Sequence, residues 1–163
     1  MERLWTPWRR AFVEAAAGES ADQGCFLCAA ATSSDDPGHL VLRRAARTYV
    51  LMNRYPYNTG HLLVAPYAHE GDLAALDGTV AADLMHTVQQ CVAVLAGEYR
   101  PHAFNIGMNL GRPAGAGLPD HLHVHIVPRW QGDTNFMPVL GDTKVLPESL
   151  DQTYERLEPR FRT

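Results

Sequence analysis

The sequence predicts an α+β domain in which an antiparallel sheet of about five strands packs against one long helix. Two observations predict this class. Three β-prone runs separated by turn residues fill residues 40–66, and an apolar pattern of helical period follows before two further β-prone runs. With 163 residues and 46% hydrophobic content, the chain suits one compact core. We therefore treat residues 1–163 as a single domain.

The first part of the chain is expected to form three strands of a meander after an irregular start. Residues 1–24 are an N-terminal arm with Trp5 and Trp8, and a Gly/Ser/Asp-rich segment follows, in which Cys25 and Cys28 lie in loop-like sequence. The expected strands cover residues 40–42, 48–52 and 60–66, the last after a turn rich in Pro, Asn and Gly.

The second part begins with the long helix, predicted from about residue 70 to residue 99. Its apolar positions are Leu84, Val88, Cys91 or Val92, and Leu95. We therefore expect Cys91 in the core. Beyond the helix we predict strands over 103–109 and 121–128, joined by a Gly/Pro-rich loop over 111–119, and then a C-terminal tail over 130–163 with short helical or irregular pieces.

Composition narrows the functional classes. The net charge of −4 lacks the basic excess of a general nucleic-acid binder. The apolar runs are too short to cross a bilayer, and the N-terminus has basic residues but no apolar segment typical of a secretory signal. Three cysteines, an odd number, do not suggest a disulfide framework. We expect a cytoplasmic protein without membrane or general nucleic-acid partners.

The most informative motif is the set of three histidines His121, His123 and His125, which alternate with apolar residues. On a strand, alternate side chains share a face, so the imidazoles are expected about 7 Å apart on one face with the apolar residues on the other. Imidazole is a common zinc ligand, and a metal-binding face is one interpretation of this spacing.

The loop before the histidines favours a different chemistry. Its glycines, Gly115 and Gly117 among them, allow backbone N–H groups to approach an anion beside the imidazoles. A neutral histidine can attack phosphorus and later leave. Loop and histidines together therefore indicate phosphoryl chemistry, whereas the loop alone would be an ordinary connection.

These residues resemble the histidine triad family, whose signature is three histidines alternating with apolar residues. Residues 53–66, followed by His69, resemble the nucleoside-binding hairpin of the diadenosine-polyphosphate branch. The Trp5/Trp8 arm, the two cysteines and residues 128–137 resemble bacterial members related to diadenosine tetraphosphate phosphorylases and dinucleoside polyphosphate hydrolases. The resemblance implies the histidine triad fold, with a short helix beside the long one and sheets paired in a homodimer.

The resemblance also implies roles for single residues. His123 is the nucleophile that takes a nucleoside monophosphate as a phosphoramidate, while Asn109 and His125 stabilise the transition state. Asn53 holds the ribose hydroxyls, and His61 is a buried histidine that supports the triad. Taken alone, Asn53 reads as a turn residue and His61 as a hydrogen-bonded core histidine.

One departure from the common eukaryotic pattern concerns the leaving group. Gly117 and Leu118 stand where a Gln followed by Ser or Thr is frequent in the family. The chain therefore keeps the backbone N–H of Gly117 but lacks the side-chain amide and hydroxyl. We do not carry over strict specificity for diadenosine triphosphate or for aminoacyl phosphoramidates.

The cysteine pair raises the question of a metal. Two cysteines at this spacing supply half of a tetrahedral site, which in a cytosolic chain indicates zinc before a disulfide. By the resemblance, His69 and His121 join Cys25 and Cys28 in a closed, structural zinc site. The alternative is a redox-active or unpaired cysteine pair with His69 on the surface. Mg²⁺ bound with a polyphosphate substrate is a further candidate cofactor.

The remaining histidines have no motif around them, and we expect them on the surface or hydrogen-bonded: His39, His86 and His102.

Two further expectations concern the C-terminal part of the chain. Trp130 is assigned to the nucleotide site by the resemblance, although a tryptophan after a buried strand is often packing. The tail over 130–163 is expected near the active site; a solvated end is the alternative.

Three functions follow. The first is a nucleotide-binding enzyme that transfers or hydrolyses a nucleotidyl group from dinucleoside polyphosphates such as diadenosine tetraphosphate. The second is a nucleoside phosphoramidase. The third is a nucleotide-binding regulatory protein with incidental turnover.

Overall fold

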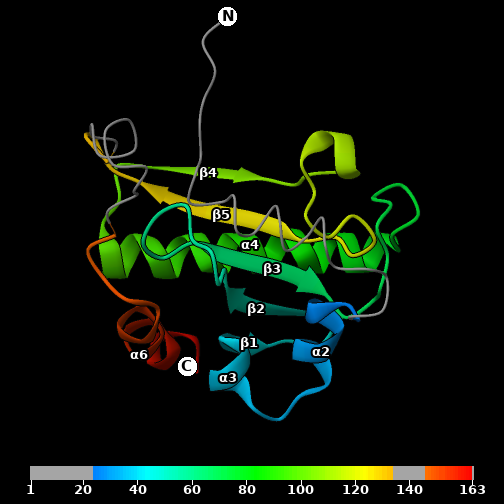
Figure 1. Cartoon of the computed structure of the whole chain (residues 1–163), viewed down its shortest axis with the longest axis horizontal. Helices are drawn as coiled ribbons and strands as arrows, with labels where there is room; N and C mark the ends of the chain where they lie inside the picture. Colours follow the sequence, from blue (N-terminus) through cyan, green and yellow to red (C-terminus); the bar gives the residue numbers. More distant parts are fainter. Residues whose placement is uncertain (1–23, 134–145, 163) are drawn as a thin grey trace, which may run out of the picture.

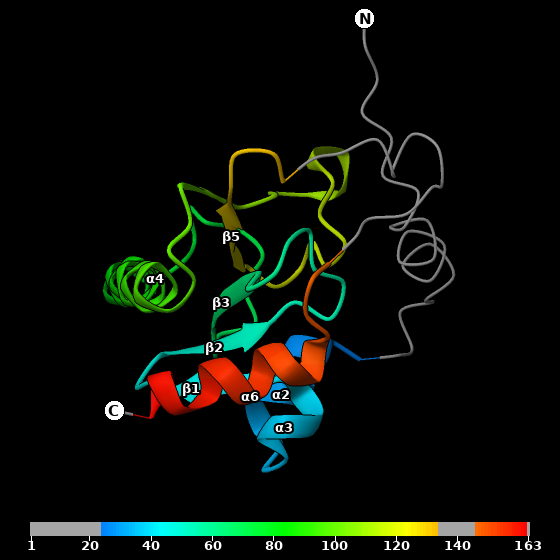
Figure 2. The ribbon, with the colours of Figure 1, turned by 90° about the vertical axis from the view of Figure 1, so that its left-hand side faces the viewer.

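The computed structural model describes residues 24–133 and 146–162, which form one five-stranded antiparallel sheet with helices on both faces (Figures 1 and 2). The strand order is β1-β2-β3-β5-β4. The α+β class and the five strands are thus confirmed. The strands are β1 (Val41–Arg44), β2 (Thr48–Met52), β3 (Leu62–Pro66), β4 (Ala103–Gly107) and β5 (Val124–Arg129). The arm with Trp5 and Trp8 and residues 134–145 of the tail lie outside the described residues.

The long helix α4 begins later than the apolar pattern suggests. The described helices are α2 (Phe26–Thr32), α3 (Asp36–His39), α4 (Gly78–Tyr99), the 3-10 helix η2 (Arg112–Ala114) and α6 (Leu150–Phe161). The predicted start of α4 was about residue 70. The Asp77 side chain caps α4 by accepting hydrogen bonds from the backbone of Thr79 and Val80. None of the described helices is long and apolar enough to span a membrane.

The predicted helical turns over residues 70–77 are wrong because this segment packs against the chain before β5. The backbone N–H of Leu122 donates to the Glu70 carbonyl at 2.7 Å. A Cβ added to Gly71 would lie 2.4 Å from the Pro119 carbonyl oxygen, so the two backbones pass too closely for any side chain. A tertiary contact therefore overrides the local preference for helix.

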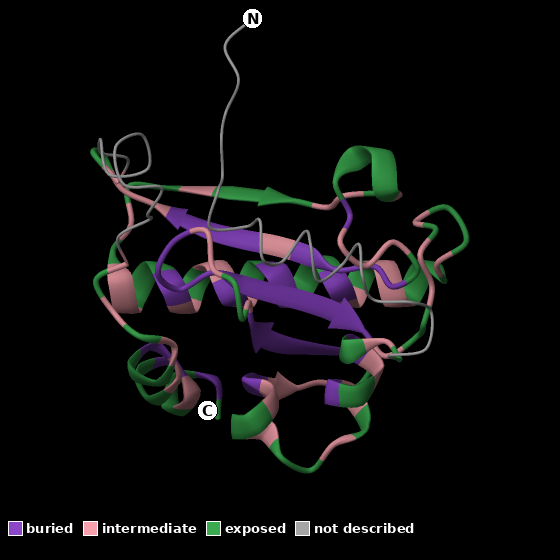
Figure 3. Ribbon diagram, in the orientation of Figure 1, coloured by how far each residue is buried: buried purple, intermediate pink, exposed green. Residues whose placement is uncertain are grey.

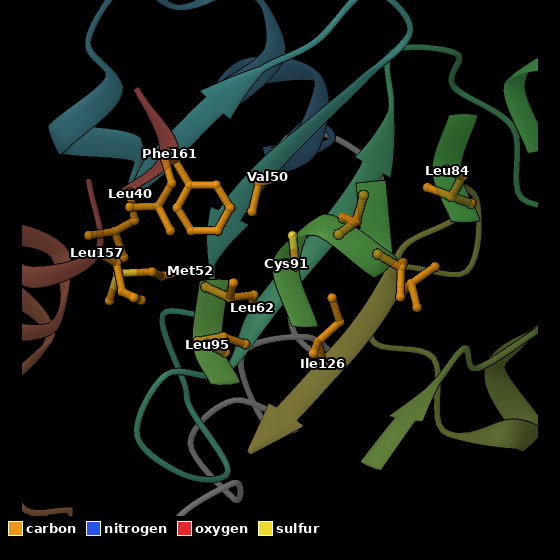
Figure 4. Packing of buried hydrophobic residues seen from close by; sticks show 14 residues of the cluster. Leu40, Val50, Met52, Leu62, Leu84, Cys91, Leu95, Ile126, Leu157 and Phe161 are labelled. Atoms are coloured by element: carbon orange, nitrogen blue, oxygen red, sulfur yellow. The ribbon is translucent and has the colours of Figure 1, made fainter. Parts of the chain in front are cut away.

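One face of the sheet is covered by α4. Its buried residues Leu84, Val88, Cys91 and Leu95 recur at helical spacing and pack on the sheet, as expected (Figures 3 and 4). Burial raises the pKa of the Cys91 thiol, which keeps it protonated. Cys91 is confirmed as a core residue.

The opposite face of the sheet carries α2. Within β2 the side chains alternate between the two faces. Val50 and Met52 belong to the hydrophobic cluster between the sheet and α4, called here the α4 cluster. Tyr49 and Leu51 belong to a second cluster, which contains Leu27 of α2. Because both faces are covered, every residue of β2 and β3 is buried.

Helix α2 is closed at its C-terminal end by Arg44 of β1. The guanidinium donates to the carbonyls of Ala30, Ala31 and Ser33, each at 2.8 Å, and to Asp36 Oδ1 at 2.7 Å. These bonds satisfy carbonyls that a helix end leaves unpaired. Arg44 therefore fixes α2 to the sheet.

The described end of the tail is part of the core. Helix α6 starts with a capping box of Ser149 and Gln152, and its Leu157 and Phe161 side chains are buried among the residues of the α4 cluster. The Tyr154 hydroxyl donates to the Val41 carbonyl at 3.0 Å. The solvated-end interpretation is wrong for this segment.

Candidate functional site

A cavity of about 470 Å³ lies on the sheet face that carries α2. Its walls include α2 residues and the side chains of Leu51 and Leu63, from the middle of β2 and β3. Six of the residues assigned to the site from sequence line it: Asn53, Asn109, Gly115, Gly117, His123 and His125. Residues distant in sequence are thus brought to one cavity.

The three histidines of the motif do not all belong to the strand. Strand β5 begins at Val124, so His121 and His123 precede it. The apolar residues between them are nevertheless buried, as the alternation predicts. The rings of His123 and His125 lie 5.0 Å apart between centroids, whereas the His121 side chain turns toward the cysteine pair.

The imidazole of His123 is held in one tautomer. Its Nδ1 lies 2.9 Å from the carbonyl oxygen of His121, and a carbonyl can only accept, so the ring proton is on Nδ1. The residue is only 8% exposed, and this burial lowers the pKa of His123. The lone pair is therefore on Nε2 of a neutral ring, as a nucleophile requires.

His125 is oriented by a chain of hydrogen bonds that starts at a backbone amide. The Tyr57 N–H donates to His61 Nδ1 at 3.1 Å, which leaves the His61 proton on Nε2. His61 Nε2 in turn lies 3.0 Å from His125 Nδ1 and donates to it. The ring proton of His125 is then on Nε2, so His125 Nε2 is a hydrogen-bond donor.

Tyr57, which begins this series of hydrogen bonds, was not predicted from the sequence. Its ring stacks on His125 at 5.8 Å with an interplanar angle of 12°, and its amide fixes the tautomer of His61. The contribution of a backbone N–H leaves no trace in residue type, so no sequence signal identifies it. His61 itself is 2% exposed and is both a core residue and a support of the triad histidine His125.

Asn53, Asn109 and the glycine loop lie at the cavity, but one of the two loop amides expected to bind an anion is already hydrogen-bonded. Asn53 Oδ1 accepts from the Tyr55 N–H at 2.9 Å, a turn contact, while Asn53 also lines the cavity. Asn109 Nδ2 donates to the Gly115 carbonyl at 3.4 Å. The Gly115 N–H is used within η2, where it donates to Arg112, so the expected anion nest does not include it. In the described part of the chain, the Gly117 N–H has no such partner.

Cys25, Cys28, His69 and His121 form a group that can hold a metal ion. Their ligand atoms all lie within 4.8 Å of one another. Cys25 Sγ is 3.2 Å and Cys28 Sγ 3.5 Å from His121 Nδ1, and Cys28 Sγ is 3.1 Å from His69 Nδ1. Ligands of a tetrahedral zinc ion are separated by roughly 3.5 Å, given metal–ligand distances of about 2.0–2.3 Å.

The tautomer of His121 fits this role. Its Nε2 donates to the Pro66 carbonyl at 2.9 Å, so the lone pair of Nδ1 faces the sulfur atoms. The same residue offers its carbonyl to His123 Nδ1. His121 therefore connects the cysteine cluster with the ring of His123.

The structure also places Trp130 and the histidines outside the motif. Trp130 meets the edge of the Tyr99 ring at 6.5 Å and is not among the described residues that line the cavity, which matches the packing interpretation within one chain. His39, expected on the surface or hydrogen-bonded, is half-buried and does line the cavity. His86 and His102 have hydrogen-bond partners, Gln90 and Gln131, as expected.

Comparison with known proteins assigns the family. The HIT domain model matches residues 36–132, which contain the three histidines and the hairpin around His61. The chain belongs to the HIT domain family. The histidine triad interpretation of the motif is thereby confirmed.

Relatives and solved structures agree with this assignment. AP-4-A phosphorylase of Mycobacterium tuberculosis is 41% identical over 158 residues, covering 94% of this chain and 80% of the relative. Bis(5'-nucleosyl)-tetraphosphatase (asymmetrical) of Schizosaccharomyces pombe is 33% identical, over 59% of this chain and 52% of the relative.

Two structures share the fold. A hypothetical histidine triad nucleotide-binding protein from Sulfolobus tokodaii, 25% identical, has a TM-score of 0.64 over 85% of this chain and 89% of its own. A zinc-bound histidine triad family protein from Mycobacterium smegmatis, 20% identical, has a TM-score of 0.66 over 85% of this chain and 94% of its own.

Proposed function

We propose that this protein is an enzyme that cleaves dinucleoside polyphosphates such as diadenosine tetraphosphate through a nucleotidyl group on His123. The observation that carries the proposal is the His121 carbonyl, which holds the proton of His123 on Nδ1 and leaves Nε2 free in the cavity. The names of the relatives, a phosphorylase and a tetraphosphatase, support the substrate class.

The proposed reaction has two steps. His123 Nε2 attacks the α-phosphorus, a P–N bond forms, and the P–O bond to the departing nucleotide breaks. His125 Nε2, the donor at the end of the Tyr57–His61 chain, stabilises charge on the phosphate or the leaving oxygen. Water or inorganic phosphate then displaces His123 from phosphorus and releases AMP or ADP.

The remaining site residues bind the substrate in this proposal. Asn53 holds the ribose, and Asn109 contacts the reacting phosphate. Of the two loop amides that the sequence predicted for the anion site, only the N–H of Gly117 has no partner among the described residues, and it contacts the phosphate in this proposal. Support comes from their common position on the cavity wall.

Chromatography of diadenosine tetraphosphate incubated with the protein, with and without inorganic phosphate, tests the proposal. ADP plus ATP formed only with phosphate is expected for a phosphorylase, and AMP plus ATP for a hydrolase. A nucleoside phosphoramidate is run in parallel. Exclusive cleavage of the phosphoramidate would replace the proposal with a phosphoramidase, and binding without any product would indicate a regulatory protein.

A structural zinc ion is the second part of the proposal. Two observations support it: the four ligand atoms of Cys25, Cys28, His69 and His121 lie close together, and the lone pair of His121 Nδ1 faces the two sulfur atoms. When bound, zinc would tie α2 and the His69 segment to His121, with no ligand position left open for water. Thiolate ligands suit a reducing compartment, which supports the proposed cytoplasmic location. Mg²⁺ bound with the polyphosphate stays a prediction.

We also propose a homodimer that pairs the two β4 edges. Strand β4 is one of the two edges of the sheet, and most of its residues are exposed. Ile106, on the same face as Phe104, is 48% exposed, although edge strands of monomers normally avoid exposed apolar residues.

Light scattering is expected to give twice the chain mass of 18.0 kDa at micromolar concentration. Ile106→Lys is expected to shift the protein to monomer because a charge would be placed at the pairing edge, whereas Ile106→Val keeps the dimer. A wild-type monomer mass would contradict the proposal.

A further inference from the structure

The two cysteines at the start of α2 lie close enough together to form a disulfide. Cys25 caps the helix, and its Sγ accepts the Cys28 N–H at 3.4 Å. Residues three positions apart on one helical turn have Cα atoms separated by roughly 5 Å, and a disulfide requires about 4.4–6.8 Å. The two sulfur atoms lie within 4.8 Å of each other. A disulfide therefore needs little change in the backbone.

The cysteine cluster is open to solvent on one side. His69 is exposed and both cysteines of the pair are half-buried, whereas His121 is fully buried. A small oxidant such as hydrogen peroxide therefore reaches the sulfur atoms without unfolding of the chain. Cys91, by contrast, is 0% exposed and lies in the α4 cluster. Of the three cysteines in the sequence, the pair at α2 alone combines exposure with a second sulfur within reach.

We propose that Cys25 and Cys28 are a modification site, a peroxide-sensitive pair that forms a disulfide and releases the zinc ion when it is oxidised. A bound zinc ion keeps both sulfurs as thiolates, which is the form that attacks peroxide. The inference rests on the zinc part of the proposed function, and it does not depend on which nucleotide the enzyme cleaves.

The reaction takes hydrogen peroxide as the oxidant. One thiolate attacks a peroxide oxygen, the O–O bond breaks, and a sulfenic acid and hydroxide form. The second thiolate attacks the sulfenic sulfur, an S–S bond forms, and a second hydroxide leaves. Two protons from solvent convert both hydroxides to water. The two sulfurs lose two electrons to peroxide, and because a disulfide offers no thiolate ligand, the pair releases Zn²⁺.

Oxidation of the pair acts on His123 through His121. The Nδ1 of His121 faces the two sulfur atoms, and its carbonyl accepts the ring proton of His123. Neither sulfur of a disulfide carries a proton to donate, so after loss of the metal the Nδ1 lone pair is left without a partner in the interior, which is unfavourable. We therefore expect turnover to fall as zinc is released and to recover when the pair is reduced and zinc is returned.

Treatment of the zinc-loaded full chain with excess hydrogen peroxide tests the inference without a nucleotide. Zinc release is followed with a chromogenic chelator, and thiols are counted after denaturation. We expect loss of one zinc per chain and a fall from three thiols to one, the last being Cys91. Both cysteines of the pair lie in one tryptic peptide, residues 11–43, whose mass should be lower by two hydrogens. Dithiothreitol followed by zinc should restore the thiols and the metal.

Cys91→Ala is the matched control and should release zinc as the wild type does, with a fall from two thiols to none. His69→Ala separates the sulfur chemistry from the metal, because its pair should form the same disulfide with less zinc to release. Wild-type protein that keeps its zinc and three thiols would overturn this inference alone, as would sulfinic acid or a disulfide between two chains. Protein purified without zinc would refute the zinc proposal as well, whereas zinc release without any nucleotide cleavage would refute only the proposed enzyme activity.

Discussion

Replacement of His123 by Asn is expected to abolish turnover of diadenosine tetraphosphate, with a loss of several orders of magnitude, the effect of deleting a nucleophile. Nucleotide binding should be kept, because the cavity walls are unchanged. Turnover is lost because the variant lacks the His123 Nε2 lone pair, which the hydrogen bond to the His121 carbonyl leaves available for attack. His125→Asn should cost less, since that ring acts as a donor, and His86→Asn, on the exposed side of α4, should cost nothing.

The intermediate gives a second measurement. Quenching at alkaline pH spares the acid-labile P–N bond, so mass spectrometry should find a nucleotidyl group on the peptide that contains His123 and none in His123→Asn. Near wild-type turnover by His123→Asn would show that the nucleophile is wrongly assigned. The interpretation of the motif as a metal-binding face would then have to be reopened.

Replacement of Cys28 by Ser is expected to remove the metal and to lower the melting temperature together. The wild type should contain one zinc per chain by elemental analysis. Metal that binds only the folded state stabilises it, so loss of one ligand reduces metal content and stability in parallel. Turnover should also fall, because His121 contacts both the cysteines and His123.

Cys91→Ala serves as the control, since Cys91 lies in the core away from the cluster. It should lower stability through lost packing and keep the metal. Purified wild-type protein without metal, with melting unchanged in Cys28→Ser, would refute the zinc assignment.

Much of the fold follows from sequence patterns that depend on local physics. The β-prone runs, the helical spacing of Leu84 to Leu95 and the alternation around His123 each report a periodicity set by burial on one face. The start of α4 did not follow, because the close approach of Gly71 to Pro119 joins segments that are distant in sequence.

The candidate site likewise has features that could be predicted from the sequence and features that could not. Residue type and family resemblance indicated the histidines and the cysteine pair, whose side chains have distinctive chemistry. The Tyr57 amide that orients His61, the internal bond of the Gly115 amide, and the position of His39 were not predictable. Each depends on backbone direction or on which strands become neighbours, and neither property is written in residue type.

Helix α2 has seven residues, and a helix of this length does not persist alone in water. Its last turn is ordered by Arg44 of β1, and its cysteines lie against histidines from two other segments. The helix therefore depends on its contacts with the sheet for its order, among them the burial of Leu27 and Ala30. The wall of the cavity that Phe26 and Ala29 provide is thus held in place by tertiary contacts from β1 and from the histidine segments, and not by the helix itself.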